Sequence, residues 1–317
     1  MLHVLNGDAT AAAFQRTGIA GDRLVWRDIL VEGPVGADLE TQGALEARAD
    51  FLTARLRIDR ETYVRGAREQ AEHLAAARRH DEVVLWFEQD LFCAVNLWRL
   101  LEWFATHAPS ARLSLVYPPI DDSKGLGAAE PAALGALFEQ RTTVTDAMLA
   151  FGRRAWAAYA AADPTDALRL LEGEDAALPF VRGAFRCHLG RFPSLANGLN
   201  EVETAALAAL RRGPRDFGTL FGEVGRQSRV RRHGMGDVQF AACLRGLDPL
   251  VRLDGGDVMH ADVEMTERGH DVVAGDVDWL SVRPIDTWLG GVHLVAGGRL
   301  WRWDGSRGRL VESRAAV

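Results

Sequence analysis

The chain contains 317 residues, of which 48% are hydrophobic and 26% are charged, and its formal net charge is −7. This composition is typical of a folded globular protein, and the acidic balance excludes a general electrostatic attraction to nucleic acid or anionic membranes. Three scattered cysteines without a CxxC pair, no basic leader ahead of His3 and no apolar run of about 18 residues predict a cytoplasmic protein without a membrane partner.

The first part of the chain alternates short apolar runs with helical patterns. Four runs predict strands at residues 2–5, 23–26, 83–87 and 112–117. The patterns between them predict a helix after Asp38 and helices over 61–79 and 91–104. Strands that alternate with helices indicate a mostly parallel sheet with right-handed crossovers. We therefore predict an α/β fold with a Rossmann-like domain over residues 1–140.

A helical connector is predicted over residues 141–196. Helical patterns cover residues 143–161, 164–171 and 179–188. Asp163-Pro164 is typical of a helix start, because the carboxylate can cap the helix and proline suits its first position. The segment 192–198 that follows is typical of a linker.

Residues 197–317 are predicted to form a winged-helix-like module with a C-terminal β-hairpin. Helical patterns at 200–211, 216–225 and 235–247 precede extended segments at 251–258 and 263–266, which is the order of a winged helix-turn-helix. The tail 292–311 alternates apolar and polar residues around Gly297-Gly298, which predicts a hairpin with its turn at this pair. Trp301 and Trp303 share one face of that hairpin, where we expect them to cover a neighbouring part of the protein.

Five acidic residues follow the predicted strands. Asp8 follows the first strand, Asp28 and Glu32 follow the second, and Glu88 and Asp90 follow the third. In open α/β sheets, ligands bind just beyond the carboxyl ends of the strands. The sequence therefore predicts an acidic strand-end pocket for a small polar or phosphorylated ligand.

In the leading hypothesis this pocket belongs to a sensor that is coupled to the C-terminal module. Asp28 and Glu32 accept hydrogen bonds from ligand hydroxyls or amines. An alternative for Asp28 stays open, in which it pairs with Arg27 or Arg48 in a salt-bridged loop. Arg48 and Lys124 hold an anion, and Lys124 directly precedes the sequence Gly-Leu-Gly at 125–127, where backbone N–H groups can approach a phosphate.

An alternative hypothesis is a phosphoester-processing enzyme that depends on Mg²⁺ or Mn²⁺. These ions take oxygen ligands, which Asp8, Glu88 and Asp90 can supply. Asp8 and Asp90 also each precede a helical stretch, where a capping carboxylate contributes ~1 kcal/mol. Both roles stay open for these two residues.

A second alternative is a DNA-binding transcriptional regulator. Arg229, Arg231 and Arg232 precede the candidate recognition helix at 235–247, where they can hold phosphates while Gln239 reaches a base edge. Residues 199–260 contain nine arginines and eight acidic residues, however, so this segment lacks the strong basic footprint of most DNA-binding domains.

Three motifs carry a resemblance to a known family. They are Asn-Gly-Asp at 6–8, Trp-Arg-Asp-Ile-Leu-Val-Glu-Gly-Pro at 26–34 and Leu-Trp-Phe-Glu-Gln-Asp-Leu at 85–91. On these motifs the chain resembles the bacterial family named domain of unknown function 1835, across roughly its first 140 residues. The resemblance coincides with the five acidic residues and implies no particular activity. Gln89 and Phe92 occupy positions where the usual pattern has histidine or tyrosine, so the resemblance implies no chemical role for these two residues.

Overall fold

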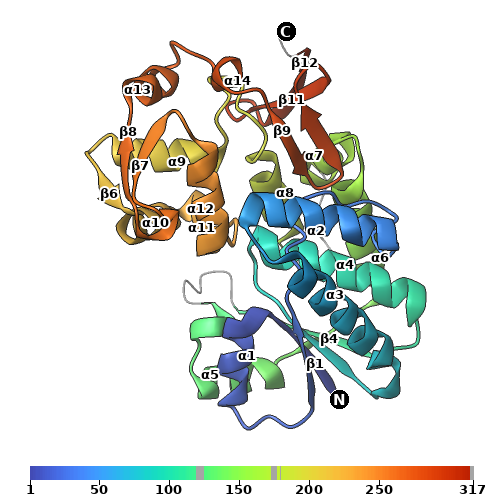
Figure 1. Ribbon diagram of the computed structural model, residues 1–317. Helices are drawn as coiled ribbons and strands as arrows, with labels where there is room; N and C mark the ends of the chain where they lie inside the picture. The colour runs from blue at the N-terminus through green and yellow to red at the C-terminus, as the bar shows by residue number, and fades with distance from the viewer. Residues whose placement is uncertain (119–124, 173–176, 179, 315–317) are drawn as a thin grey trace.

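A computed structural model describes the chain at residues 1–118, 125–172, 177–178 and 180–314 (Figure 1). It has the predicted α/β fold, with a mostly parallel five-stranded sheet followed by antiparallel strand pairs toward the C-terminus. The strand order in the large sheet is β2-β1-β3-β4-β5. These strands are β1 (Leu2–Asn6), β2 (Asp22–Trp26), β3 (Val83–Trp86), β4 (Leu113–Val116) and β5 (Thr142–Thr143).

The first four strands lie at the four apolar runs, which confirms that prediction. β1 pairs in parallel with β2 and β3, and β3 pairs in parallel with β4, whereas the short β5 runs antiparallel to β4. β3 and β4 are buried along their whole length, as expected for strands with helices on both faces. In this strand order the carboxyl ends of β1 and β3 form the switch point at which such sheets bind ligands.

Helices cover both faces of the sheet (Figure 1). On one face, Leu5 and Trp86 pack against Phe14 of α1 and Leu134 of α5. The other face packs against α3 and α4 in a larger core. The helical elements are α1 (Gly7–Gln15), α2 (Gln42–Leu56), α3 (Arg60–Ala75), η1 (Ala76–Arg79), α4 (Leu91–His107), η2 (Leu126–Ala128) and α5 (Pro131–Glu139).

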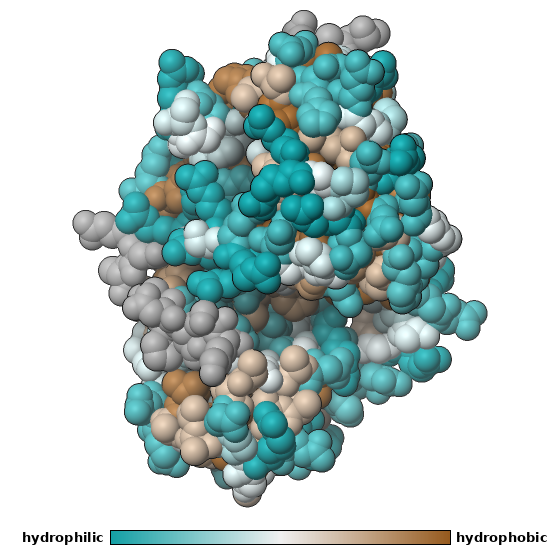
Figure 2. All heavy atoms as spheres, turned by 90° about the vertical axis from the view of Figure 1, so that its left-hand side faces the viewer, coloured by the Kyte–Doolittle hydropathy of each residue, from teal (hydrophilic) through white to brown (hydrophobic). Residues whose placement is uncertain are grey.

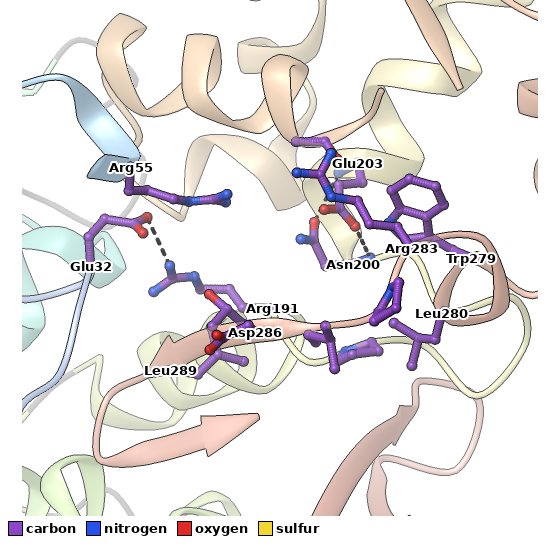
Figure 3. Close-up of a pocket in the computed structure, with 16 residues that line it drawn as sticks. Glu32, Arg55, Arg191, Asn200, Glu203, Trp279, Leu280, Arg283, Asp286 and Leu289 are labelled. Atoms are coloured by element: carbon purple, nitrogen blue, oxygen red, sulfur yellow. Dashed lines mark hydrogen bonds and ion pairs between the residues drawn. The ribbon is translucent and has the colours of Figure 1, made fainter. Parts of the chain in front are cut away.

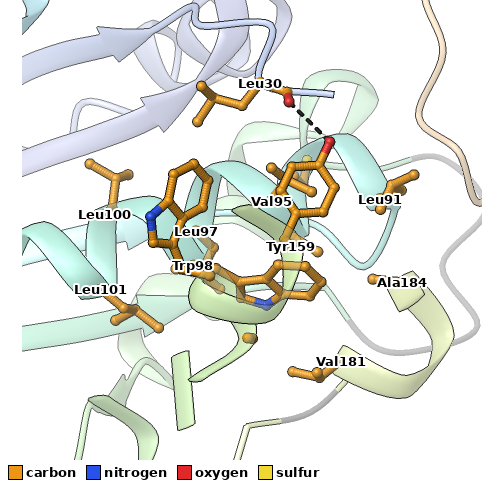
Figure 4. Close-up of a cluster of buried hydrophobic side chains, with 14 of the residues drawn as sticks. Leu30, Leu91, Val95, Leu97, Trp98, Leu100, Leu101, Tyr159, Val181 and Ala184 are labelled. Atoms are coloured by element: carbon orange, nitrogen blue, oxygen red, sulfur yellow. Dashed lines mark hydrogen bonds between the residues drawn. The ribbon is translucent and has the colours of Figure 1, made fainter. Parts of the chain in front are cut away.

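The connector helices pack directly on α4. They are α6 (Asp146–Ala160), α7 (Thr165–Glu172) and α8 (Val181–Leu189). Trp98 of α4 stacks on Phe185 of α8 with their ring centroids 4.6 Å apart. The hydroxyl of Tyr159 in α6 donates to the carbonyl of Leu30 at 3.0 Å (Figure 4). The connector therefore shares one hydrophobic core with the sheet.

Residues 199–282 hold a second core. Their elements are α9 (Glu201–Leu210), β6 (Arg215–Asp216), α10 (Phe217–Gly225), α11 (Ser228–Arg231), α12 (Asp237–Gly246), β7 (Val251–Asp254), η3 (Val258–His260), β8 (Asp262–Met265), α13 (Glu267–Ala274) and α14 (Trp279–Val282). The strands form an antiparallel sheet in the order β6-β8-β7. The three predicted helices correspond to α9, α10 and α12, and the predicted hairpin corresponds to β7 and β8, whereas α11, α13 and α14 were not predicted. The winged-helix assignment itself stays a prediction.

Two hairpins complete the described chain. They are β9 (Asp286–Leu289) with β10 (Val292–Val295), and β11 (Arg299–Asp304) with β12 (Arg309–Arg314). The hairpin predicted around Gly297-Gly298 is wrong in its strand pairing. The N–H of Gly298 donates to the carbonyl of Val295 at 3.1 Å, so the chain does turn there, but β10 pairs back onto β9 across Gly290-Gly291 and β11 pairs with β12. Trp301 and Trp303 are buried in the core that the sheet shares with the connector. Because their apolar surface is buried there, the hairpins group with the first core and not with residues 199–282, unlike the predicted division at residue 197.

One face of the protein, shown in Figure 2, is mostly polar. On the face that Figure 2 turns toward the viewer, hydrophilic residues dominate over the C-terminal module, and more apolar residues gather at the foot, where α1 and α5 lie. Among the described residues, only Met1 and Leu195 are exposed large hydrophobic side chains. Within this part of the chain, no helix is long and apolar enough to cross a membrane.

Candidate functional site

A pocket of about 440 Å³ opens beyond the carboxyl end of β2. Residues of α2, α3 and α4 form its walls, and Trp26 and Asp28 lie at the strand end. The apolar lining consists of Leu39, Leu45, Ala67, Ala71, Leu74, Leu100 and Trp103. Apolar walls with a few polar groups are typical of small-molecule sites.

Asp28 is the acidic group of this pocket. Its Oδ1 accepts from Nη2 of Arg48 at 3.0 Å and from the hydroxyl of Tyr63 at 3.2 Å. Within the described residues no group donates to its Oδ2, and the side chain is 18% exposed. Burial, together with the charge of Asp28, raises the pKa of Tyr63, which keeps that hydroxyl a neutral donor. One carboxylate oxygen is therefore fixed by the protein, and the other is left for a donor on a ligand.

Arg48 holds the loop after β2 together and does not face a ligand. Its side chain is buried, and each of its five N–H donors meets an acceptor. These acceptors are the Tyr63 hydroxyl, Asp28 Oδ1 and the carbonyls of Ile29, Glu32 and Pro34, at 3.0–3.3 Å. Burial works to lower the pKa of Arg48, but the charge of Asp28 raises it overall. Since no donor remains, the predicted role of Arg48 in holding an anion is wrong.

Cationic side chains stand at the rim of the pocket. Arg99 is paired with Glu40 at 2.5 Å. Arg68 donates to the side chain of Gln42 at 3.0 Å, and its charge has no acidic partner within the described residues. Within the described residues, the side chain of Arg78 forms neither a hydrogen bond nor an ion pair. Arg68 and Arg78 are therefore the groups best placed to meet an anionic part of a ligand.

Asp8 lies in the first turn of α1 and outside this pocket. Its carboxylate binds the guanidinium of Arg27 through both oxygens, at 2.7–3.0 Å. The hydrogen bonds from Arg27 lower the pKa of Asp8. Because the helix begins at Gly7 after Asn6, Asp8 is not its N-cap, so the capping role considered for it is wrong.

Glu88 and Asp90 follow β3 and accept from backbone groups. Oε1 of Glu88 accepts from the N–H of Leu126 at 2.8 Å. Oδ1 of Asp90 accepts from the N–H of Cys93 at 2.8 Å and caps α4, which confirms the capping role. Burial raises the pKa of Asp90 in spite of that hydrogen bond.

The C-terminal module covers the start of α4. The N–H of Leu91 donates to the carbonyl of Arg232 at 2.8 Å. A Cβ on Gly234 would collide with the carboxylate of Asp90, so the backbone there lies against this side chain. Asp90 is therefore enclosed between α4 and the module.

Glu32 lines a second cavity, of about 250 Å³, where the loop after β2 meets the end of α2, the segment after α8, α9, α14 and β9 (Figure 3). Its Oε1 accepts from Nη2 of Arg191 at 2.9 Å. Arg191 also donates to the carbonyl of Val31, so it ties the connector to the loop. Asp28 and Glu32 therefore face different cavities.

The five acidic side chains do not converge on one pocket, and this part of the prediction is wrong. Each carboxylate instead accepts hydrogen bonds from a different arginine or backbone N–H group. Among the described residues, no group of three or more His, Cys, Asp or Glu side chains is placed to hold a metal ion. Asp8, Glu88 and Asp90 accordingly do not form the ligand set predicted for Mg²⁺ or Mn²⁺. Lys124 lies outside the described residues.

The candidate recognition helix α12 packs against the N-terminal domain. Val238 and Ala242 contact the cluster formed by Leu52 and Leu56 of α2. Oε1 of Gln239 accepts from the N–H of Gly236 at 3.1 Å, at the start of its own helix. Residues 240–244 of α12 are buried, and the side chain of Gln239 is engaged at the start of its own helix, so the predicted base contact of Gln239 is not supported.

Asn96 is a site residue that the sequence did not reveal. It is fully buried, and its Oδ1 accepts from Nε1 of Trp26 at 3.1 Å. Its Nδ2 donates to Oδ1 of Asn6 at 3.3 Å and to the carbonyl of Asp28 at 3.1 Å. Asn96 thus links the ends of β1 and β2 and positions the backbone of Asp28. A buried amide needs partners, so an asparagine among the apolar residues of α4 was the signal that could have found it.

No family model matches the chain, and no curated protein matches it. The resemblance to the family of domain of unknown function 1835 therefore stays a prediction, and the function has to be inferred from the geometry of the pocket.

Proposed function

We propose that the protein binds a small polar molecule in the pocket beyond β2. The carboxylate of Asp28 carries this proposal, because Arg48 and Tyr63 fix one oxygen and leave the other open to the pocket. The ligand donates to Oδ2 of Asp28 from a hydroxyl or an amine. A phosphate on the same ligand reaches Arg68 and Arg78 at the rim.

Preorganisation supports this role. A hydrogen bond to a charged group contributes about 1.5–3 kcal/mol, and a carboxylate that is already held in place loses little conformational freedom on binding. The apolar walls around Leu45, Leu100 and Trp103 take the remaining part of the ligand.

Helix α2 contacts both this pocket and the C-terminal module. Its first half contributes Gln42 and Leu45 to the pocket wall. Its second half packs Leu52 and Leu56 against Ala242 of α12. A ligand that shifts α2 therefore changes a contact of the module, and we include a sensor role in the proposal on this basis. The three cysteines are buried free thiols, in keeping with the cytoplasmic location that we also propose.

A thermal-shift screen against nucleosides, sugars, amines and phosphorylated metabolites tests the proposal. A compound at a hundredfold excess over its dissociation constant stabilises the folded state by ~2.7 kcal/mol. The critical variant is Asp28→Asn, which keeps Oδ1 for Arg48 and Tyr63 and puts a donor where the ligand needs an acceptor. We expect it to lose the shift.

Asp8→Asn is the matched control, because Asp8 lies outside the pocket and is 73% exposed. It is expected to keep the full response. If a saturable response is the same in the wild type and in Asp28→Asn, binding occurs elsewhere and the proposal fails.

A second candidate function, contact with DNA phosphates, has one observation in its favour. Arg229, Arg231 and Arg232 are exposed and form no ion pair within the described residues. Because α12 is packed against α2, these arginines would hold phosphates without reading bases. Replacing all three by glutamine should then reduce the slope of log affinity against log salt by ~0.9 for each lost phosphate contact. An unchanged slope removes this candidate.

A further inference from the structure

The cavity of about 250 Å³ shown in Figure 3 lies where three parts of the chain meet. Arg55 comes from the end of α2, Glu203 from α9, and Arg283 follows α14. Arg55 reaches into the cavity from one side, and Glu203 lies opposite (Figure 3). The apolar part of the lining includes Trp279, Leu280 and Leu289.

Arg55 is the group whose partners are missing. Its Nε is buried and has no hydrogen-bond partner within the described residues. Its guanidinium forms no ion pair there either, although it lines a polar cavity. A buried donor without an acceptor is destabilising, and more so when the group is charged. Arg55 can therefore donate to an acceptor on a molecule that binds in the cavity.

The surrounding charges favour an anion as that acceptor. Within the described residues, the guanidinium of Arg283 donates only to neutral carbonyls, those of Gly246 at 3.0 Å and Asp248 at 3.1 Å. Glu203 is the acid between the two arginines, and its Oε2 already accepts from the N–H of Asn200 at 2.9 Å. Three acids and three arginines line the cavity, and Arg55 and Arg283 are the two arginines that form no ion pair within the described residues.

The other charged groups of the cavity do not neutralise Arg55 and Arg283. Burial raises the pKa of Glu203, which weakens it as a counter-charge, and the hydrogen bond from Asn200 and the charges of Arg55 and Arg283 offset this only in part. Glu32 is already paired with Arg191, and Asp286 is 75% exposed and lies 2.8 Å from Nε2 of His293. A water molecule could accept from Nε of Arg55, but a neutral molecule leaves the charges of Arg55 and Arg283 without an ion-pair partner.

We propose that this cavity binds a small oxyanion, a carboxylate or a phosphate group on a compact molecule, with Arg55 and Arg283 as its cationic donors. The geometry of the guanidinium suits either group, because its N–H donors match paired oxygens. A short apolar portion of the ligand packs against Trp279 and Leu289. The site is distinct from the pocket of Asp28, although α2 contributes to both.

Titrations of the wild-type protein with potassium phosphate and with potassium malonate test the proposal. Each is compared with potassium chloride at the same ionic strength, and the melting temperature is followed. We expect a saturable rise with at least one of the two anions. A response to phosphate alone identifies a phosphate-bearing ligand, and a response to malonate alone identifies a carboxylate. If neither anion exceeds chloride, the proposal is overturned.

Variants of Arg55 locate the effect. Arg55→Gln should weaken the anion affinity by about tenfold or more, which corresponds to ~1.4 kcal/mol. Arg55→Lys keeps the charge and the long stem but loses the forked donors, so it serves as a second variant if the glutamine protein does not fold. Arg57→Gln is the matched control, since Arg57 is exposed, lies two residues further on and does not line the cavity.

Equal anion affinity in Arg55→Gln and in the wild type would overturn the assignment. Asp28→Asn must leave the anion response unchanged, because Asp28 does not line this cavity. The two proposals can therefore fail separately: loss of the metabolite response concerns only Asp28, and loss of the phosphate or malonate response concerns only Arg55.

Discussion

Replacing Arg48 by methionine should destabilise the protein more than any surface arginine change. The side chain is 1% exposed, and its five hydrogen bonds hold the loop after β2. Methionine fills the space of the stem but leaves Asp28 with an unpaired charge. Removing one partner of a buried ion pair costs about 3–5 kcal/mol, and because Asp28 is 18% exposed we expect the lower end, ~3 kcal/mol.

Urea denaturation of the wild type, Arg48→Met and the control Arg68→Met measures this cost. Arg68 is exposed and makes one hydrogen bond to Gln42, so its replacement should change the free energy of unfolding by no more than ~0.5 kcal/mol. Adding Asp28→Asn to Arg48→Met removes the unpaired charge and should recover part of the loss. A loss below ~1 kcal/mol for Arg48→Met at unchanged denaturant dependence would refute the role assigned to this residue.

Three further predictions concern stability. His188 is buried, and burial lowers its pKa from 6.5 to about 3, so between these pH values only the unfolded chain takes up the proton. Protonation of the unfolded chain should therefore remove about 2 kcal/mol of stability between pH 8 and pH 5. Identical profiles of stability against pH for His188→Gln and the wild type would contradict this. A Cβ on Gly291 would collide with the carbonyl of Ala160, so Gly291→Ala should lower the free energy of unfolding by about 1–3 kcal/mol, measured by thermal unfolding. The control Gly66→Ala places its Cβ in open space within α3 and should raise the free energy of unfolding by about 0.5–1 kcal/mol. Asp90→Ala should lose about 1 kcal/mol of capping energy in urea, and Asp90→Asn, which still caps α4, should lose none.

Local sequence signals predicted most of the elements. The apolar runs at β1 to β4 are long enough for strands and too short for helices, and the structure places strands at all four. Asp163 accepts from the N–H of Thr165 at 2.9 Å, as its position before Pro164 indicates. The hairpin was assigned to the wrong pair of strands because two glycine pairs, 290–291 and 297–298, carry the same local signal. The chain turns at both pairs, and no local pattern shows that β10 pairs with β9 while β11 pairs with β12.

The candidate site was harder to predict, because its geometry depends on contacts between distant segments. The sequence allows Arg48 either to pair with Asp28 or to hold an anion, and only the folded loop shows that all of its donors are in use within the protein. Glu32 meets Arg191, which lies 159 residues further along the chain. The enclosure of α12 likewise follows from how the module packs against α2, which no local pattern in either helix specifies.

Hydrogen–deuterium exchange with and without a stabilising compound from the metabolite screen tests the proposed function most directly. The account predicts slower exchange in the segments that line the pocket, residues 26–28, 41–48, 63–78 and 99–107. It also predicts that Asp28→Asn abolishes this protection. Protection confined to α1, to the C-terminal hairpins or to the cavity of Arg55 would contradict the assignment of the pocket beyond β2.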